Sequence, residues 1–188
     1  MDQSSGDRVT VNHDRYPDEY LRGILNEVRT IAVVGASNKD VRPSYFVMKY
    51  LQGKGYRMIP VNPGLAGQEI LGETVYASLT DVPVPIDMVD IFRNSAAAAG
   101  IVDEALALPV RPKAVWMQFN VRNDDAARKA EAAGIRARQT GLVIELMDEA
   151  ARALGASIDP RRLSATAHAL NGAYEALAHW WYANPDVP

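Results

Sequence analysis

The chain has 188 residues, 48% of them hydrophobic and 23% charged, which is ordinary for one globular domain with flanking extensions. The absence of cysteine excludes disulfides, thiolate nucleophiles and cysteine-ligated metals, and it fits the cytoplasm, where we expect the protein. A net charge of −3 disfavours nucleic acid as a partner, and no apolar run approaches the roughly 20 residues of a membrane span, so we expect no membrane partner either.

The pattern of apolar residues predicts strands and helices that alternate along the chain. Pro17 fits the first position of a helix over 16–28 with one apolar face. There follow a strand over 30–34, a helix over 43–53, a strand over 57–61, and a loop over 64–85 with one short helical turn near Leu79. Further strands are predicted over 87–92, 113–118 and 135–138, and helices over 96–108, capped by Ser95, over 124–133, capped by Asn123, and over 144–154.

These elements divide the chain into three parts. We expect a mobile polar leader over 1–15, one domain over 16–155 and a helical extension over 156–188. The extension could join two copies in a homodimer, bind a partner protein, or pack on the domain. Its apolar residues recur with spacings of four and three, as on one face of a helix: Leu163, Ala167, Leu170, Tyr174, Leu177 and Trp181.

Alternating strands and helices predict an α/β fold, a Rossmann-like doubly wound parallel sheet of about five strands. Because crossovers are right-handed, we expect the strand order 3-2-1-4-5, counted along the chain. Ligands of such sheets bind at the carboxyl ends of the strands. This edge would bring together 35–37, 62–64, 92–95 and 118–120.

The most informative segment is the turn after the first strand. The apolar run Ile31–Val34 ends at Gly35, and a helix is expected to begin at Pro43, which is a geometry that presents backbone N–H groups to a phosphate. The full G-x-G-x-x-G signature is absent, since Ser37 and Asp40 stand at the other two glycine positions. The turn therefore predicts a nucleotide-type ligand, and a plain strand-to-helix turn is the alternative. The side chains of Ser37, Lys39, Arg42 and Ser44 could add donors.

The ends of the other strands narrow the choice of ligand. An NAD site places Asp or Glu about 20 residues after the glycines, and an NADP site uses Arg. Here the second strand ends in Asn62-Pro63, which makes a dehydrogenase less favoured and predicts a rigid turn that could line an adenine pocket. Arg93 could face a phosphate or pair with Asp90 or Glu73, and we interpret Trp116 as a core residue.

Together these segments resemble the small bacterial CoA-binding proteins that share the CoA-binding Rossmann domain of succinyl-CoA synthetase alpha subunits. The resemblance covers roughly 17–150 and lies in 31–37, 42–44, 59–63, 75–83, 89–93 and 114–118. It implies CoA or an acyl-CoA as the ligand. The residues expected to bind it are Gly35, Ala36, Ser37, Asn38, Lys39, Arg42, Ser44, Val61, Asn62, Pro63, Phe92, Arg93, Asn94 and Gln118.

The chain departs from this family after its last predicted strand. Family members often carry Asp-Arg-Cys-Pro-Lys-Ile-Glu there, whereas this chain reads Gln-Thr-Gly-Leu-Val-Ile-Glu over 139–145. Gly141 stands at the cysteine position and Val143 at the lysine position, so no mixed disulfide with the CoA thiol can form.

No catalytic constellation is visible, and we expect binding without chemistry and without a metal. The histidines are His13, in the expected leader, and His168 and His179, in the extension; none has a metal-site spacing. The leading hypothesis is a regulatory or carrier-like module for CoA or acyl-CoA. The alternatives are an NAD(P)-binding oxidoreductase and an interaction subunit with a vestigial nucleotide pocket.

Overall fold

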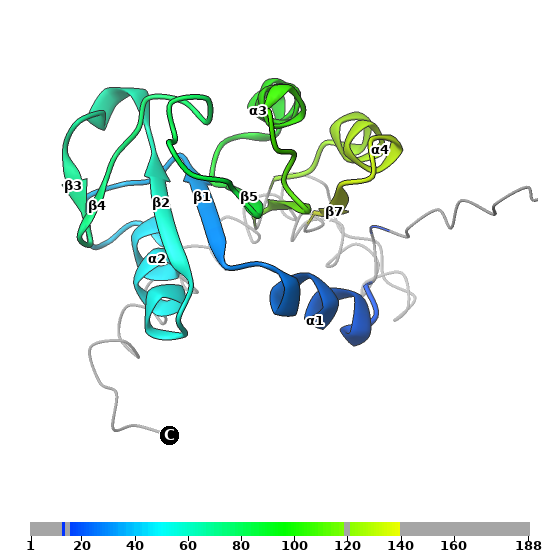
Figure 1. The fold of residues 1–188 in the computed structure, drawn as a ribbon, viewed down its shortest axis with the longest axis horizontal. Coiled ribbons are helices and arrows are strands. Elements are labelled where there is room, and N and C mark those ends of the chain that lie inside the picture. The colour runs from blue at the N-terminus through cyan, green and yellow to red at the C-terminus, as the bar shows by residue number, and fades with distance from the viewer. Residues whose placement is uncertain (1–12, 14–15, 119–120, 140–188) are drawn as a thin grey trace, which may run out of the picture.

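Five short apolar runs form the strands of one parallel sheet. The computed structural model describes residues 13, 16–118 and 121–139. The sheet contains β1 (Thr30–Val34), β2 (Arg57–Val61), β5 (Met88–Ile91), β6 (Ala114–Met117) and β7 (Arg136–Arg138). Its faces are covered by α1 (Asp18–Glu27) and α2 (Pro43–Gly53) on one side and by α3 (Ser95–Ala107) and α4 (Asp124–Ala132) on the other (Figure 1). The predicted doubly wound α/β fold is confirmed.

The predicted strand order is wrong. The order is β2-β1-β5-β6-β7, so the third long strand lies beside β1 and not outside β2. The outer edge of β2 is instead bridged by Tyr76, whose N–H donates to the Pro60 carbonyl (3.0 Å) and whose carbonyl accepts from Asn62 N (2.8 Å). With that position taken, the chain crosses to the other side of β1. The point where the connections diverge therefore lies between β1 and β5.

The connection between β2 and β5 holds more structure than the loop we predicted. It begins with a 3-10 turn, η1 (Pro63–Leu65), and continues in a hairpin of β3 (Glu69–Ile70) and β4 (Glu73–Thr74). Leu71 and Gly72, at the tip of the hairpin, both have positive φ, the conformation that a two-residue hairpin turn needs. Only bends and turns surround Leu79, where we expected a helical turn.

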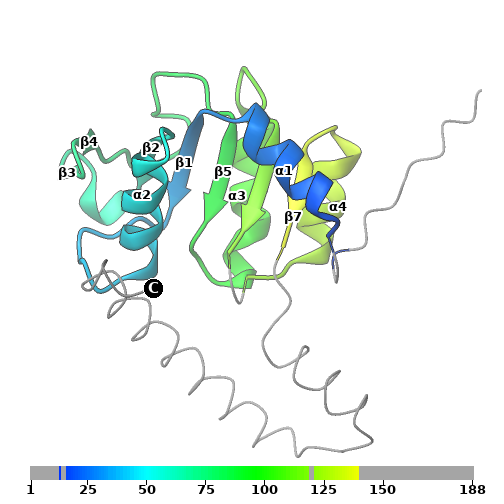
Figure 2. The same cartoon turned by 90° about the horizontal axis from the view of Figure 1, so that it is seen from below.

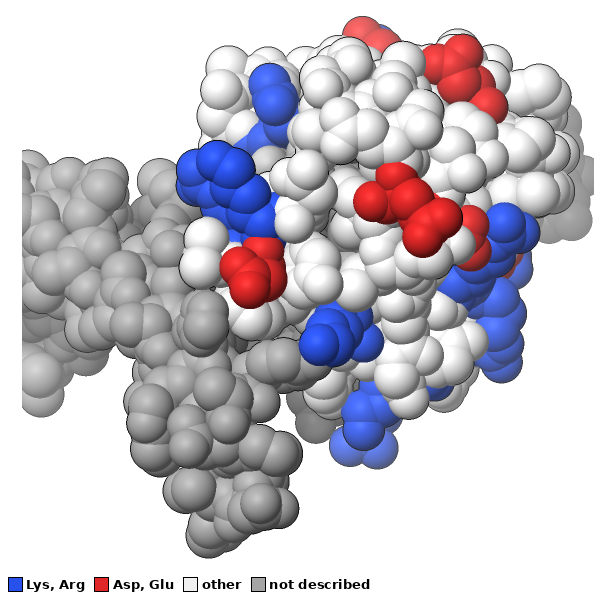
Figure 3. Space-filling model, turned by 90° about the vertical axis from the view of Figure 1, so that its left-hand side faces the viewer, with Lys and Arg blue, Asp and Glu red and all other residues white. Residues whose placement is uncertain are grey.

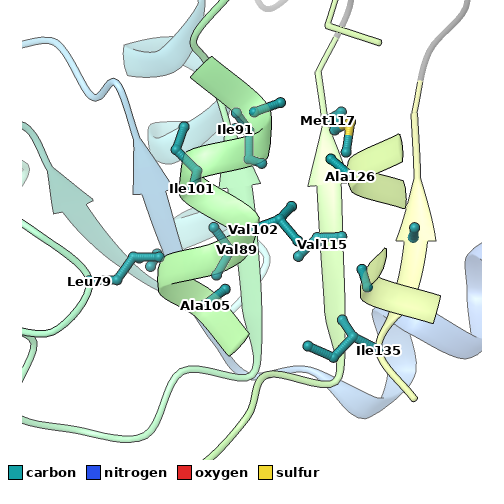
Figure 4. Close-up of a cluster of buried hydrophobic side chains, with 14 of the residues drawn as sticks. Leu79, Val89, Ile91, Ile101, Val102, Ala105, Val115, Met117, Ala126 and Ile135 are labelled. Carbon is teal, nitrogen blue, oxygen red and sulfur yellow. The ribbon is translucent and has the colours of Figure 1, made fainter. Parts of the chain in front are cut away.

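Two apolar layers hold the helices to the sheet. Between the sheet and α3 and α4, alternate strand residues such as Val89, Ile91, Val115 and Met117 pack against helix residues such as Val102 (Figure 4). The opposite face packs Ile31, Val33, Met58 and Met88 against α1 and α2. The strands are buried on both faces, as expected for a parallel sheet.

Aromatic side chains attach the N-terminal helix to the far edge of the sheet. The Tyr20 hydroxyl donates to the Ala137 carbonyl (2.9 Å), and the Tyr16 hydroxyl accepts from Gln139 N (2.8 Å). His13 contacts the Tyr16 hydroxyl (2.6 Å) and Glu131 of α4 (3.4 Å), so this residue of the expected leader is packed against the domain.

Asparagines cap both helices on the other face. Asn123 accepts from Ala126 N (2.9 Å), as predicted for α4. At α3 the cap is Asn94, which accepts from Ala97 N (2.9 Å), so the prediction of Ser95 as cap is wrong. The helix expected over 144–154, the altered stretch 140–145, the extension over 156–188 and its apolar seam lie outside the described residues. None of the helices within the described ranges combines the length and apolar character that a membrane span requires.

The ends of β1 and β5 approach each other at Gly35. Gly35 has φ +93°, and a Cβ at this position would lie 2.6 Å from the Phe92 carbonyl oxygen and 2.9 Å from Arg93 Cδ. The Gly35 N–H donates to the Val61 carbonyl (2.9 Å). A glycine is therefore required here by the protein's own packing, in addition to any approach of a ligand.

We expect Gly35→Ala to lower the free energy of unfolding by roughly 2–4 kcal/mol, because it combines left-handed backbone strain with overpacking against β5. Gly67→Ala is the matched control, since Gly67 also has positive φ (+80°) but nothing within 4 Å of its Cβ position. Gly67→Ala should cost about 1 kcal/mol. Denaturant unfolding of both variants measures the difference, and equal costs would contradict the role of the contact with Phe92.

Candidate functional site

Hydrogen bonds to the backbone join the loops after β1 and β2. The Asn62 side chain donates to the Ala36 carbonyl (2.8 Å) and accepts from Gly64 N (2.9 Å). Its backbone N–H is bonded to Tyr76. Asn62 therefore connects the Gly35 turn, η1 and the strand-like segment at 76. The loops form one rigid rim at the carboxyl ends of β1 and β2.

Within the loop from β1 to α2, the Ser37 hydroxyl accepts from Lys39 N (3.2 Å). The Asn38 amide lies 3.5 Å from the side-chain oxygen of Gln68. Arg42 precedes α2 as its N-cap residue, with no capping bond from its side chain. The N-terminus of α2 therefore faces the same edge as the Gly35 turn, and a helix N-terminus carries partial positive charge.

Three cationic side chains at this edge stand apart from the ion pairs of the domain. Lys39, Arg42 and Arg93 are exposed, and none has a carboxylate partner within the described ranges. The two pairings considered for Arg93 do not form, because Glu73 pairs with Arg57 (2.8 Å) and Asp90 accepts from Gln118. Basic and acidic groups are interspersed over the face shown in Figure 3.

Several predicted residues meet the crevice only through their backbone, or lie elsewhere. Ala36 and Val61 are buried, and Val61 offers its carbonyl to Gly35 N. Ser44 is also buried, in the first turn of α2. The acceptor of Asn94 is used as the α3 cap, and the Gln118 side chain turns onto the α1–α2 face of the sheet. Exposed Pro63 lies in η1, and half-buried Phe92 packs against the core on the α1–α2 face.

A second feature lies on the face of the sheet between α1 and α2. A cavity of about 250 Å³ has apolar walls that include Leu25 of α1 and Val47 and Leu51 of α2. Asp90, Trp116 and Arg138 line it from three adjacent strands. Figure 2 looks toward this face and shows β5 between the two helices.

A comparison with protein families matches 29–147 to a family described as "CoA binding domain". The chain belongs to this family. The match is close to the 17–150 covered by the resemblance noted in the sequence, and the family assignment made from the strand-end motifs is confirmed.

Similar proteins include the uncharacterized protein YneT of Bacillus subtilis (strain 168), which is 35% identical over 114 residues, or 61% of this chain and 82% of YneT. A solved structure from Thermus thermophilus, described as cell-free ID.343, is 40% identical with a TM-score of 0.62, covering 66% of this chain and 91% of the other. A hypothetical protein from Pyrococcus horikoshii OT3 is 38% identical with a TM-score of 0.61, covering 70% and 91%.

The sequence analysis did not single out Asp90 or Arg138 as site residues. The signal for Asp90 was available in the sequence, since it is a charged residue inside the apolar run of β5. A carboxylate is rarely buried without a function or a partner. Asp90 is 1% exposed; one carboxylate oxygen accepts from Gln118 Nε2 (3.2 Å), and the other, Oδ1, has no hydrogen-bond partner within the described part of the chain. Trp116, interpreted as core, is half-buried and lies under the Arg138 guanidinium at 4.5 Å.

Burial raises the pKa of Asp90 to about 7, and the Gln118 hydrogen bond and the positive charge of Arg138 oppose this rise only in part. A carboxyl whose pKa is higher in the folded than in the unfolded state favours folding at low pH. That stability is complete below pH 4 and is lost as pH rises through 7.

We therefore expect Asp90→Asn to remove a pH dependence of stability. Relative to this variant, the wild type should lose up to about 4 kcal/mol of unfolding free energy between pH 4 and pH 8, since each pKa unit is worth about 1.4 kcal/mol. Denaturant unfolding at several pH values measures it. The control is Asp103→Asn, at an exposed site on α3 that pairs with Lys129. Its difference in unfolding free energy from the wild type should vary by less than about 1 kcal/mol over the same pH range. If the unfolding free energies of wild type and Asp90→Asn change in parallel with pH, burial does not shift the pKa of Asp90.

Proposed function

We propose that the crevice at the carboxyl ends of β1, β2 and β5 binds CoA or an acyl-CoA, and that the protein acts by binding, as a regulatory or carrier module, without catalysing a reaction. The observation that carries the proposal is the group of three cations around the Gly35 turn that have no carboxylate partner in the described part of the chain, in a member of the CoA-binding-domain family. In this proposal the phosphates of CoA supply the missing negative charge.

The local geometry supports an anion at this position. Lys39 and Arg42 precede the first residue of α2, and Arg93 packs beside Gly35 at the junction of β1 and β5. Charged donors form the stronger class of hydrogen bonds to phosphate, and the positive end of α2 adds to them. At this point the chain leaves the ends of β1 and β5 toward opposite faces of the sheet, and ligands of doubly wound sheets bind at such a point.

The alternative of a nicotinamide cofactor has less support. The end of β2 carries Asn62 in place of an acidic residue, and both ends of its amide are engaged with backbone groups at Ala36 and Gly64. The Asn62 side chain therefore stabilises the loops of the rim. A ribose that needs a carboxylate acceptor at the end of β2 has none there.

Calorimetric titration with CoA, acetyl-CoA, NAD and ATP tests the ligand. We expect both CoA species to bind and NAD to bind at least tenfold more weakly. Lys39→Gln should weaken CoA binding about tenfold, because it removes one charged contact worth roughly 1.5–3 kcal/mol when fully formed.

The control is Lys54→Gln, which changes a lysine after the other end of α2, where the ammonium lies over Tyr50. It should leave CoA affinity within twofold. The absence of heat with either CoA species at millimolar concentration would contradict the proposal, as would NAD binding tighter than CoA. Mass spectrometry of small molecules released from freshly purified protein would show which acyl group, if any, accompanies CoA.

A further inference from the structure

The cavity between α1 and α2 has a polar floor in an otherwise apolar layer. Strand pairing places Asp90 opposite Trp116, and Trp116 opposite Arg138, so the three residues lie in one row across β5, β6 and β7. Residues at neighbouring positions on this face, such as Met88 and Ala114, belong to the apolar core. The row of Asp90, Trp116 and Arg138 therefore places two charged groups within an otherwise apolar layer.

One of the two oxygens of the Asp90 carboxylate, at one end of the row, has no hydrogen-bond partner among the described residues. Asp90 is one of the residues that line the cavity. Its Oδ1 is buried and receives no hydrogen bond from the described residues, although Gln118 binds the other oxygen. An unsatisfied buried acceptor costs free energy, and a ligand with an N–H donor would recover it.

A cation lies at the other end. Arg138 is held over the Trp116 ring at 4.5 Å, and one of its guanidinium nitrogens lies 3.4 Å from the Met117 carbonyl. A ligand with only a positive charge would be attracted to Asp90 but repelled by Arg138. A ligand with only a negative charge would be attracted to Arg138 but repelled by Asp90. The two charges together favour a ligand that carries both.

The size of the cavity limits the ligand. A volume of about 250 Å³ corresponds to roughly eight waters of liquid, which suits a small molecule. The backbones of β5 and β7 lie about 10 Å apart, at two strand spacings. The opposite charges of a ligand that reaches both side chains are therefore separated by several bonds, and the apolar walls suit a short aliphatic chain between them.

We propose that the cavity lined by Asp90, Trp116 and Arg138 is a second binding site, specific for a small zwitterion with an amine at one end of a short aliphatic chain and a carboxylate at the other. The amine donates to Asp90 Oδ1, and the carboxylate accepts from the Arg138 guanidinium. This site is separate from the crevice proposed for CoA, and its occupation does not require CoA.

The test uses the full chain, freed of CoA, and titrates it with 4-aminobutyrate by calorimetry and saturation-transfer NMR. Butylamine and butyrate, each with one of the two charges, are the matched ligands. We expect 4-aminobutyrate to bind at least tenfold more tightly than either. Asp90→Asn and Arg138→Gln should each weaken it at least tenfold.

Arg136→Gln is the control variant, since Arg136 lies two residues earlier on β7 and pairs with Glu27 outside the cavity (2.7 Å). It should bind 4-aminobutyrate within twofold of wild type. Equal binding of the three ligands, unchanged binding in the two cavity variants, or no binding would overturn the proposal. It would also be overturned by an experimental structure in which residues 140–188 fill the cavity. Because the titration is made without CoA, its failure leaves the CoA proposal untouched, and failure of CoA binding leaves this one untouched.

Discussion

The close approach of β1 and β5 at Gly35 is the constraint on which the site depends. The Phe92 carbonyl oxygen lies 2.6 Å from the position that a Cβ on residue 35 would take, so glycine is what allows the two strand ends to approach this closely. This contact brings Arg93 beside the loop that carries Lys39 and Arg42. The same turn is bonded to the end of β2 through the Val61 carbonyl. One glycine thus holds three strand ends in the arrangement that presents the cations.

The two faces of the sheet differ in what they are built to do. The face under α3 and α4 is packed with apolar side chains such as Val89, Val115 and Met117. The face under α1 and α2 places a buried carboxylate and a stacked guanidinium among apolar groups, at a cost that apolar residues would avoid. A layer that needed only stability would not contain Asp90. Its presence beside a cavity is the physical reason for assigning a ligand to that face.

Local signals in the sequence predicted most of the elements but not their neighbours in space. The runs 30–34, 57–61 and 114–117 became strands within a residue or two of the expected bounds, because their apolar composition suits burial on both faces. The order of the strands was missed, since Tyr76 occupies the edge of β2 through backbone bonds that no side-chain pattern reveals. The hairpin at Leu71-Gly72 was missed because its turn needs a positive φ at both residues, and leucine rarely adopts one.

The sequence by itself determined the α/β class, the family and the identity of the residues around the Gly35 turn, because these depend on short segments whose chemistry is local. Only the tertiary structure decided that Lys39, Arg42 and Arg93 have no carboxylate partner among the described residues, with Glu73 paired to Arg57 and Asp90 bonded to Gln118. It also decided that Asp90 and Arg138, separated by 47 intervening residues of sequence, share one cavity. Strand register sets that proximity, and register is a property of the assembled sheet.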